Sequence, residues 1–292
     1  MNLATLSVPF PGARRPLEEG AKLGLWSFTL LNEQTREIPA ADTYIMAAWS
    51  PAYERLLSYG DRRGILWTSS AGEMDFMPIE RQYLWEIMMD PRIDFVWFGD
   101  RGLAEAFPGK GFYAPYPLSC DLQPPQVAKE DICTLFCPTK ASKNIYNMLL
   151  AMKIVQRKQK LTLHTNIEGY EEILHDLDVV RYNYWLPTPQ YHNLLARAKV
   201  NLAVSWAETF NYQVAEALLL GTASIISHTI PVPGITVSGP NDPEDIAEII
   251  HHYALAPEYY AQELRQELKT KSSQWNEDLT ERLKKLNLLP AT

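Results

Sequence analysis

The sequence predicts an α/β protein with two doubly wound parallel sheets that face a central cleft. Short apolar runs alternate with amphipathic segments almost throughout the 292 residues, which is typical of βα units around parallel sheets. The alternation stops between residues 108 and 126, where glycines and prolines crowd together, and then starts again. A chain of this length suffices for two cores of about 120 to 150 residues each. We therefore expect domains at 1–120 and 121–272, followed by a C-terminal helical segment at 273–292.

The first half predicts four strands and two helices. Its apolar runs end in loop or cap residues, and Ser50 before Pro51 is a favourable helix start. The expected strands are Leu3–Val8, Thr43–Ala48, Gly64–Thr68 and Phe95–Phe98. The expected helices are Pro78–Met89 and Arg101–Ala106, and the segment Pro9–Arg15 is expected to be a loop.

The second half repeats the same pattern. Apolar residues at helical spacing predict its helices, and Gly221 is the residue type preferred just past a helix end. The expected strands are Ile132–Phe136, Leu161–His164, Val179–Tyr182, Val200–Val204 and Ala223–Ile226. The expected helices are Lys143–Arg157, Tyr170–Leu177, Pro189–Ala196, Tyr212–Leu220, Asp242–Ala254, Pro257–Lys269 and Trp275–Leu288.

Composition and charge restrict the function classes. The net charge of −8 repels nucleic acid and anionic membranes, although the pairs Arg14–Arg15 and Arg62–Arg63 could form local basic strips. The three cysteines fit neither a zinc spacing nor a disulfide scaffold. We see no signal peptide and no run of the roughly 18 apolar residues that a membrane span needs. These features predict a cytoplasmic protein with reduced thiols and no integral membrane segment.

The segment Ser205–Gly221 carries two carboxylates beside a predicted helix start. Glu208 lies in the loop after a strand, and Glu216 lies on the helix that begins near Asn211. A helix N-terminus attracts phosphate, and eight residues of helix span about 12 Å. One carboxylate could therefore meet a sugar and the other a ribose, with a diphosphate between them. The alternative is two solvated acids, but an unpaired carboxylate among the apolar neighbours of Glu216 would be costly.

This segment resembles the signature of the family-4 retaining glycosyltransferases. Their pattern has two glutamates eight residues apart, with phenylalanine and glycine after the first, and alanine and a later glycine after the second. The matching residues here are Glu208, Phe210, Asn211, Glu216, Ala217 and Gly221, so an asparagine replaces one glycine. The resemblance covers roughly residues 130–288 and implies a GT-B fold of two Rossmann-like domains. The family's last helix, matched here around Trp275, returns toward the N-terminal domain.

The resemblance also implies roles for these residues. Glu208 would approach the donor sugar and Glu216 would bind the nucleotide ribose. Backbone amides around Phe210, Asn211 and Tyr212 would hold the sugar and the diphosphate.

Lys140 and Lys143 follow the first strand of the second half. The family places an arginine and a lysine at this turn, aimed at the diphosphate, so the resemblance implies that both lysines stabilise the leaving group. Lysine neutralises phosphate but lacks the planar fork of arginine. Two solvated lysines are the alternative. Cations at a helix start are mildly unfavourable, so a phosphate partner would explain them.

The remaining predicted contacts rest on the order of elements. Tyr182 and Asn183 would belong to a nucleobase wall, with a structural aromatic cluster as an equal alternative. The first half contains no histidine, which many relatives place beside the donor sugar. Arg14 or Arg15 could meet phosphate or acceptor. The nearest other polar candidates on the acceptor side are Thr68, Ser69, Glu73 and Asp75.

The resemblance predicts transfer of a sugar, with retention, from a nucleoside diphosphate to an acceptor hydroxyl. UDP is the first choice of nucleotide, and the acceptor would be a saccharide, lipid or protein. The resemblance implies no bound metal and no cofactor, and we see no ligand cluster that suggests a metal. One alternative is a viral DNA glycosyltransferase acting on a hydroxylated nucleobase inside an infected host cell. Another is a non-catalytic GT-B-like binding protein. The protein would be a monomer or homodimer, free or peripherally attached to a membrane.

Overall fold

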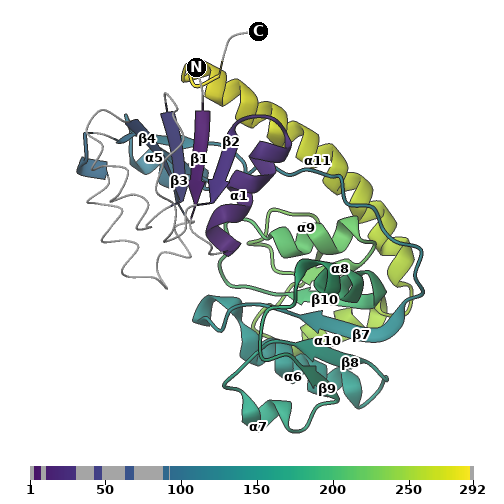
Figure 1. Ribbon diagram of the computed structural model, residues 1–292. Helices are drawn as coiled ribbons and strands as arrows, with labels where there is room; N and C mark the ends of the chain where they lie inside the picture. Colours follow the sequence, from purple (N-terminus) through teal and green to yellow (C-terminus); the bar gives the residue numbers. More distant parts are fainter. Residues whose placement is uncertain are drawn as a thin grey trace. The chain divides into compact units, whose positions relative to one another are not determined.

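The computed structural model describes residues 3–7, 11–30, 43–47, 63–68, 88–91 and 93–289. The chain divides into two compact units, one of residues 1–119 with 271–292 and the other of residues 120–270. We call these unit 1 and unit 2. Within the described ranges, each unit contains a six-stranded parallel sheet flanked by helices (Figure 1).

Unit 1 has its strands in the order β2-β1-β3-β4-β5-β6. Two buried tryptophans fix its core. The Trp26 indole donates a hydrogen bond to the Leu17 carbonyl (2.7 Å), and the Trp97 indole donates to the Ala114 carbonyl (2.8 Å). Both rings are therefore buried with their indole N–H groups hydrogen-bonded. The strands are β1 (Leu3–Ser7), β2 (Ser27–Leu30), β3 (Thr43–Ala47), β4 (Arg63–Thr68), β5 (Ile93–Phe98) and β6 (Gly111–Tyr113). The helices of unit 1 with both ends among the described residues include α1 (Pro11–Lys22) and α5 (Arg101–Ala106).

Helix α1 corrects the prediction of a loop at Pro9–Arg15. Proline is tolerated in the first turn of a helix, so Pro11 does not prevent the start. Leu17 on this helix is completely buried, and the buried Glu19 carboxylate accepts hydrogen bonds from Lys22 and from the Ser119 backbone, both at 2.7 Å. Tertiary contacts therefore stabilise a helix whose glycine and proline content argues against it.

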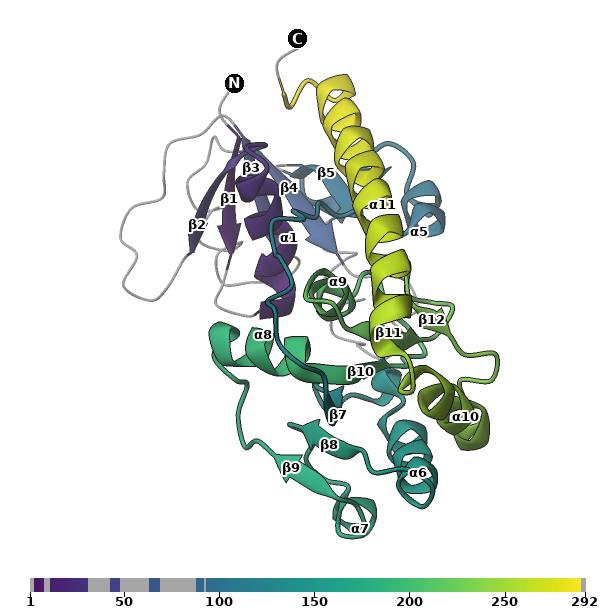
Figure 2. The ribbon, with the colours of Figure 1, turned by 90° about the vertical axis from the view of Figure 1, so that its right-hand side faces the viewer.

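Unit 2 has its strands in the order β12-β11-β10-β7-β8-β9 (Figure 2). Its main core lies where α6 and α10 pack on the sheet, with Leu149, Met152 and Leu163 fully buried. The strands are β7 (Glu130–Leu135), β8 (Thr162–Thr165), β9 (Val179–Arg181), β10 (Ala198–Ala203), β11 (Ala223–Ile226) and β12 (Ile235–Thr236). The helices are η1 (Ala141–Lys143), α6 (Ile145–Gln156), α7 (Glu171–Leu174), α8 (Thr188–Arg197), α9 (Tyr212–Leu219) and α10 (Pro243–Tyr253).

Three side chains form a buried polar row across the middle of this sheet. Asn201 on β10 accepts a hydrogen bond from Thr134 on β7 (3.0 Å) and donates one to Ser224 on β11 (2.9 Å). The Gln213 amide, in the first turn of α9, also lies 3.3 Å from the Asn201 oxygen. The row therefore connects the sheet interior to the start of α9.

Helix α11 (Pro257–Lys285) is continuous, whereas we expected two helices with a break between residues 269 and 275. The intervening Thr270–Gln274 contains neither glycine nor proline, so nothing ends the helix there. Residues up to Thr270 belong to unit 2 and those from Lys271 belong to unit 1. No helix in the described part of the chain is long and apolar enough to cross a membrane.

Candidate active site

Asn211 caps helix α9 at the point where the family signature has a glycine. Its side-chain oxygen accepts a hydrogen bond from the Val214 backbone N–H (3.1 Å), and its amide nitrogen donates to Glu208 (2.8 Å). The backbone at Asn211 is extended, with φ −121°, so the position needs a cap and not a left-handed residue. Asn211 thus starts the helix and orients Glu208 at the same time.

Lys143 and Glu208 form an ion pair although they lie 65 positions apart in the sequence. The Lys143 ammonium donates to the Glu208 carboxylate, and only about a tenth of each side chain is exposed (10% and 8%). Lys143 ends the η1 turn after β7, and Glu208 follows β10, which is the neighbouring parallel strand. The carboxyl ends of parallel strands meet at one sheet edge, so the topology brings these two residues together.

The turn that carries Lys143 is tied to the loop that carries Glu208. The Trp206 backbone N–H donates to the Ser142 carbonyl (2.8 Å). Asn144 adopts the left-handed conformation (φ 52°) between η1 and α6, and its amide donates to the Pro240 carbonyl (2.5 Å). Lys140 sits at the start of the same turn, three residues before Lys143. The structure therefore gives Lys143 a carboxylate partner, and its contact with a phosphate stays a prediction.

Glu216 lies on α9, and its side chain is 12% exposed. Its neighbours Val214, Ala215 and Ala217 are buried. The Nε2 atom of His192, on α8, lies 3.6 Å from Glu216 Oε1. Glu216 is therefore a largely enclosed carboxylate and not a solvated acid.

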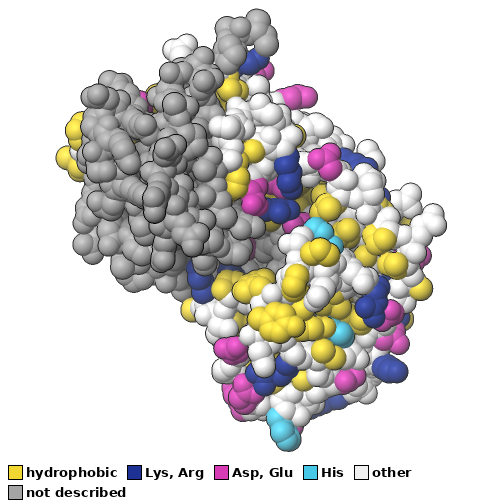
Figure 3. Space-filling model, in the orientation of Figure 1, with side chains coloured by type: hydrophobic (Ala, Val, Ile, Leu, Met, Phe, Trp, Pro, Cys, Tyr) yellow, Lys and Arg dark blue, Asp and Glu magenta, His cyan; other side chains and the backbone are white. Residues whose placement is uncertain are grey.

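Tyr182 lies in an aromatic cluster. Its ring centroid is 5.6 Å from that of Phe136, and its hydroxyl is 3.0 Å from His164 Nδ1. Phe136 also meets Tyr191 at 5.4 Å. Asn183 is exposed, as are Tyr184 and Trp185. Tyr182 therefore packs in an aromatic cluster, and the residues directly after it are exposed. Figure 3 shows hydrophobic side chains among charged ones on the face of unit 2 in view.

The predicted acceptor-side residues lie in unit 1. Arg14 and Arg15 are on α1, and the Arg15 guanidinium faces Glu19 at 3.4 Å and Glu18 at 4.0 Å. Arg15 therefore has carboxylate partners. Thr68 is the last residue of β4. The side chains of Arg14 and Thr68 lie outside the described residues, as do Ser69, Glu73 and Asp75 altogether.

Two residues near Glu216 were missed by the sequence analysis. Tyr191 and His192 lie on α8, which packs against α9, and Tyr191 packs against the apolar cluster that includes Ala217 and Leu220. Burial, the charge of Glu216 and then Cys137 raise the pKa of the Tyr191 hydroxyl well above its usual value. No motif marks these residues, since their proximity to Glu216 arises only from helix packing.

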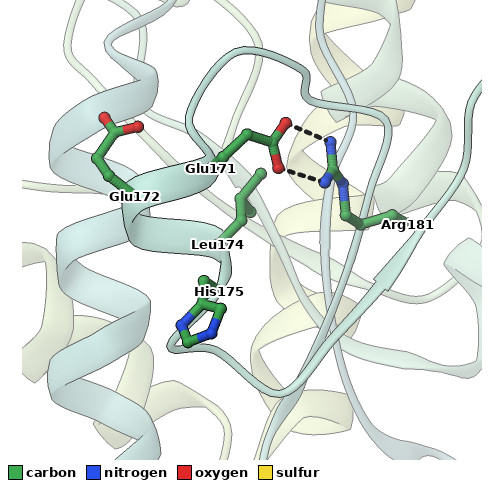
Figure 4. Close-up of a pocket in the computed structure, with 5 residues that line it drawn as sticks. All are labelled: Glu171, Glu172, Leu174, His175 and Arg181. Carbon is green, nitrogen blue, oxygen red and sulfur yellow. Dashed lines mark hydrogen bonds and ion pairs between the residues drawn. The ribbon is translucent and has the colours of Figure 1, made fainter.

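An open hollow of unit 2 lies elsewhere, around α7 and β9 (Figure 4). Arg181 spans one side of it with two hydrogen bonds to Glu171 (2.5 and 2.9 Å), which hold the pKa of Glu171 below its usual value. Glu172, Leu174 and His175 complete the lining. None of the predicted donor-site residues lines this hollow, so we do not place the donor there. The described residues contain no group of three or more potential metal ligands.

The fold is that of known glycosyltransferases. No family model and no curated protein matches the sequence. Among solved structures, a UDP-forming α,α-trehalose-phosphate synthase from Burkholderia xenovorans aligns over 100% of both chains with a TM-score of 0.68 and 10% identity. A trehalose-6-phosphate synthase studied for glycosyl transfer with retention aligns over 98% of this chain and 99% of its own (TM-score 0.66, 11% identity). The chain has the GT-B fold. The predicted fold class is therefore confirmed.

A further structural relative shows how far the likeness extends. TarM from S. aureus, solved with UDP and α-GlcNAc-glycerol, aligns over 86% of this chain and 56% of its own, with a TM-score of 0.63 and 15% identity. At such identities the likeness establishes the fold alone. Any activity must be argued from the residues of this chain.

Proposed function

We propose that the protein is a retaining glycosyltransferase that moves a sugar from a nucleoside diphosphate to an acceptor hydroxyl. One observation carries the proposal. Lys143, Glu208 and the start of α9 meet at the carboxyl edge of the unit 2 sheet, and the enclosed Glu216 follows along the same helix. In doubly wound sheets, ligands bind beyond the carboxyl ends of the strands.

The donor's diphosphate would take the place between Lys143 and the N-terminus of α9. The positive end of a helix and an ammonium group both stabilise phosphate charge. Lys143 would then exchange part of its interaction with Glu208 for the diphosphate, leaving Glu208 to orient the sugar. Lys140 on the same turn would add a second positive charge. Glu216 would accept hydrogen bonds from the ribose, with exposed residues after Tyr182 beside the base.

In the transfer step, the bond between the anomeric carbon and the diphosphate oxygen breaks. A bond from the acceptor oxygen to the same carbon forms on the same face, and the acceptor proton moves to the departing phosphate oxygen. The leaving group gains negative charge as the bond breaks, so Lys143 and the α9 dipole would stabilise the transition state more than the ground state. This arrangement requires no general base from the protein.

UDP is our first choice of nucleotide, since two of the structural relatives are described as UDP-forming or as bound to UDP. A saccharide, lipid or protein hydroxyl is the proposed acceptor. The alternative acceptor, a hydroxylated base in viral DNA, needs a basic surface. The net charge of −8 and the carboxylate partners of Arg15 count against it.

A thermal-shift series with UDP, GDP, ADP and their glucose conjugates tests the proposal. A donor nucleotide at 100 times its Kd should stabilise the folded protein by about 2.7 kcal/mol. Hydrolysis of the stabilising nucleotide sugar without acceptor then separates an enzyme from a non-catalytic binding protein. Glu216→Ala should abolish the shift, and Lys143→Ala should lower kcat. The proposal is wrong if no nucleotide shifts the melting temperature, or if both variants behave as the parent protein does.

A further inference from the structure

Two polar atoms on α8 are buried without a hydrogen-bond partner among the described residues. They are the Tyr191 hydroxyl oxygen and the His192 Nε2 atom. Buried polar atoms without partners are rare in folded proteins, and each one calls for a physical explanation. These two belong to consecutive residues of the helix that packs against α9, the helix that carries Glu216.

The His192 atom lies almost within hydrogen-bond distance of Glu216. The separation from Nε2 to Oε1 is 3.6 Å, whereas a charge-assisted hydrogen bond is about 2.7 to 2.9 Å long. A shift of less than about 1 Å by either side chain would therefore form the bond. Both side chains are largely enclosed, with 20% of His192 and 12% of Glu216 exposed, so water competes weakly for either group.

Holding one carboxylate oxygen fixes the direction of the other. A carboxylate accepts hydrogen bonds on both oxygens in one plane. If His192 holds Oε1, the plane of the carboxylate is set, and Oε2 has a defined direction in which to accept a hydroxyl. A partner that orients a ligand-binding group in this way holds the site in its binding geometry, and its removal weakens binding.

We infer that His192 is a positioning residue that holds Glu216 in the orientation in which it binds the vicinal hydroxyls of the donor's ribose. The inference rests on the proposed function, because it assumes that Glu216 meets the ribose. It goes further by assigning a role to a residue outside the family signature. Tyr191 provides the neighbouring wall, and its hydroxyl stays protonated because burial and the charge of Glu216 raise its pKa.

The test compares ligands with and without the ribose hydroxyls. We would measure the binding of UDP and 2′,3′-dideoxy-UDP by calorimetry, with GDP and ADP and their dideoxy forms treated in the same way. Glu216→Gln should weaken UDP binding and leave dideoxy-UDP binding unchanged. His192→Ala should weaken UDP binding by roughly three- to tenfold, which corresponds to a lost hydrogen bond, and leave dideoxy-UDP binding unchanged.

Two further variants separate positioning from general structural damage. His192→Gln keeps a nitrogen donor near the Nε2 position and should bind UDP within about twofold of the parent protein. In a Glu216→Gln background, His192→Ala should cause no further loss, because the two residues act through one contact. His175→Gln is the matched control, since this exposed histidine lies on the separate hollow of Figure 4 and should change nothing.

The outcomes distinguish the inference from the proposed function. If His192→Ala weakens both ligands equally, or weakens neither, while Glu216→Gln still discriminates between them, the inference is wrong and the proposed function stands. If Glu216→Gln does not discriminate, or if no nucleoside diphosphate binds the parent protein, the proposed function is wrong and the inference falls with it.

Discussion

The Lys143 ammonium donates a hydrogen bond to the Glu208 carboxylate, joining the turn after β7 to the loop after β10. With about 10% of each side chain exposed, neither charge has much water to replace a lost partner. Removing one member of such a pair leaves the other charge buried and uncompensated, which is costly. The same two residues therefore contribute to the stability of the fold and to the proposed reaction.

Lys143→Met should lower the free energy of unfolding by roughly 3 kcal/mol, because the enclosed Glu208 charge loses its cationic partner Lys143. The double variant Lys143→Met/Glu208→Gln should recover much of that loss, since no buried charge then remains. Chemical denaturation measures both effects. Lys153→Met breaks an ion pair with Asp176 that is far more exposed, and serves as the control with an expected loss below about 1 kcal/mol. Equal losses for Lys143→Met and Lys153→Met would contradict the argument.

Variants of Asn211 test what this residue contributes at the position where the family signature has a glycine. Asn211→Ala removes the cap on α9 and should cost about 1 kcal/mol of stability, whereas Asn211→Gly should cost only a few tenths. Both variants also remove the hydrogen bond to Glu208, so both should weaken donor binding to a similar degree. Thermal unfolding and nucleotide titration measure the two effects separately. A loss of stability as large in Asn211→Gly as in Asn211→Ala would show that the cap is not what this residue contributes.

Lys129 should make stability depend on pH in the alkaline range. Burial lowers its pKa from 10.5 to about 8, although its ammonium donates hydrogen bonds to the Ala196 carbonyl (2.8 Å) and to Thr222 (2.6 Å). Between these two pH values the unfolded chain binds more protons than the folded protein does. The free energy of unfolding should therefore rise with pH over this window.

The Lys129→Met variant isolates this contribution. The difference in stability between parent and variant should change by roughly 1 to 3 kcal/mol in favour of the parent between pH 8 and 10.5. Below pH 8 the difference should be constant, because the amine is protonated in both states. Urea denaturation over the pH series measures it, and a flat difference throughout would contradict the lowered pKa.

Replacing one side chain of the buried polar row in the unit 2 sheet should destabilise the folded protein. Asn201→Ala leaves Thr134 and Ser224 without their shared partner and should cost about 2 to 4 kcal/mol. It should also lower donor affinity, since Gln213 in the first turn of α9 loses its contact. Ser224→Ala, which removes only the end of the row, should cost less. Denaturation curves that rank the two variants in the opposite order would refute the expectation.

Much of unit 2 could be predicted from the sequence, because local patterns agree with the fold there. Helix α9 ends at Leu219, one residue before the predicted end, and Gly221 has the left-handed conformation (φ 84°) expected just past the helix. Unit 1 was harder. α1 contains two prolines and two glycines, and the short strand β6 lies in a segment rich in proline and glycine. Burial of α1 side chains and pairing of β6 with β5, and not the local pattern, therefore decide these elements.

In the candidate site, too, some residues can be predicted from the sequence and others cannot. Glu208 and Glu216 could be singled out because they share one segment with a recognisable spacing. The partners of these residues come from other elements. Lys143 reaches Glu208 through the adjacency of β7 and β10, and His192 reaches Glu216 through the packing of α8 on α9. Adjacency of this kind is a property of topology, which no local pattern in a single sequence specifies.

The boundary between the two units falls within helix α11, after Thr270, and this affects the order in which the units can fold. All of residues 120–270 leave the ribosome before the stretch from Lys271 onward, on which unit 1 depends. Asn276 in that stretch exchanges two hydrogen bonds with the Leu118 backbone (2.9 and 3.0 Å), so unit 1 gains these contacts only after residues 120–270 have been made. Unit 2 can thus fold first, and unit 1 gains its contacts with the stretch from Lys271 onward later.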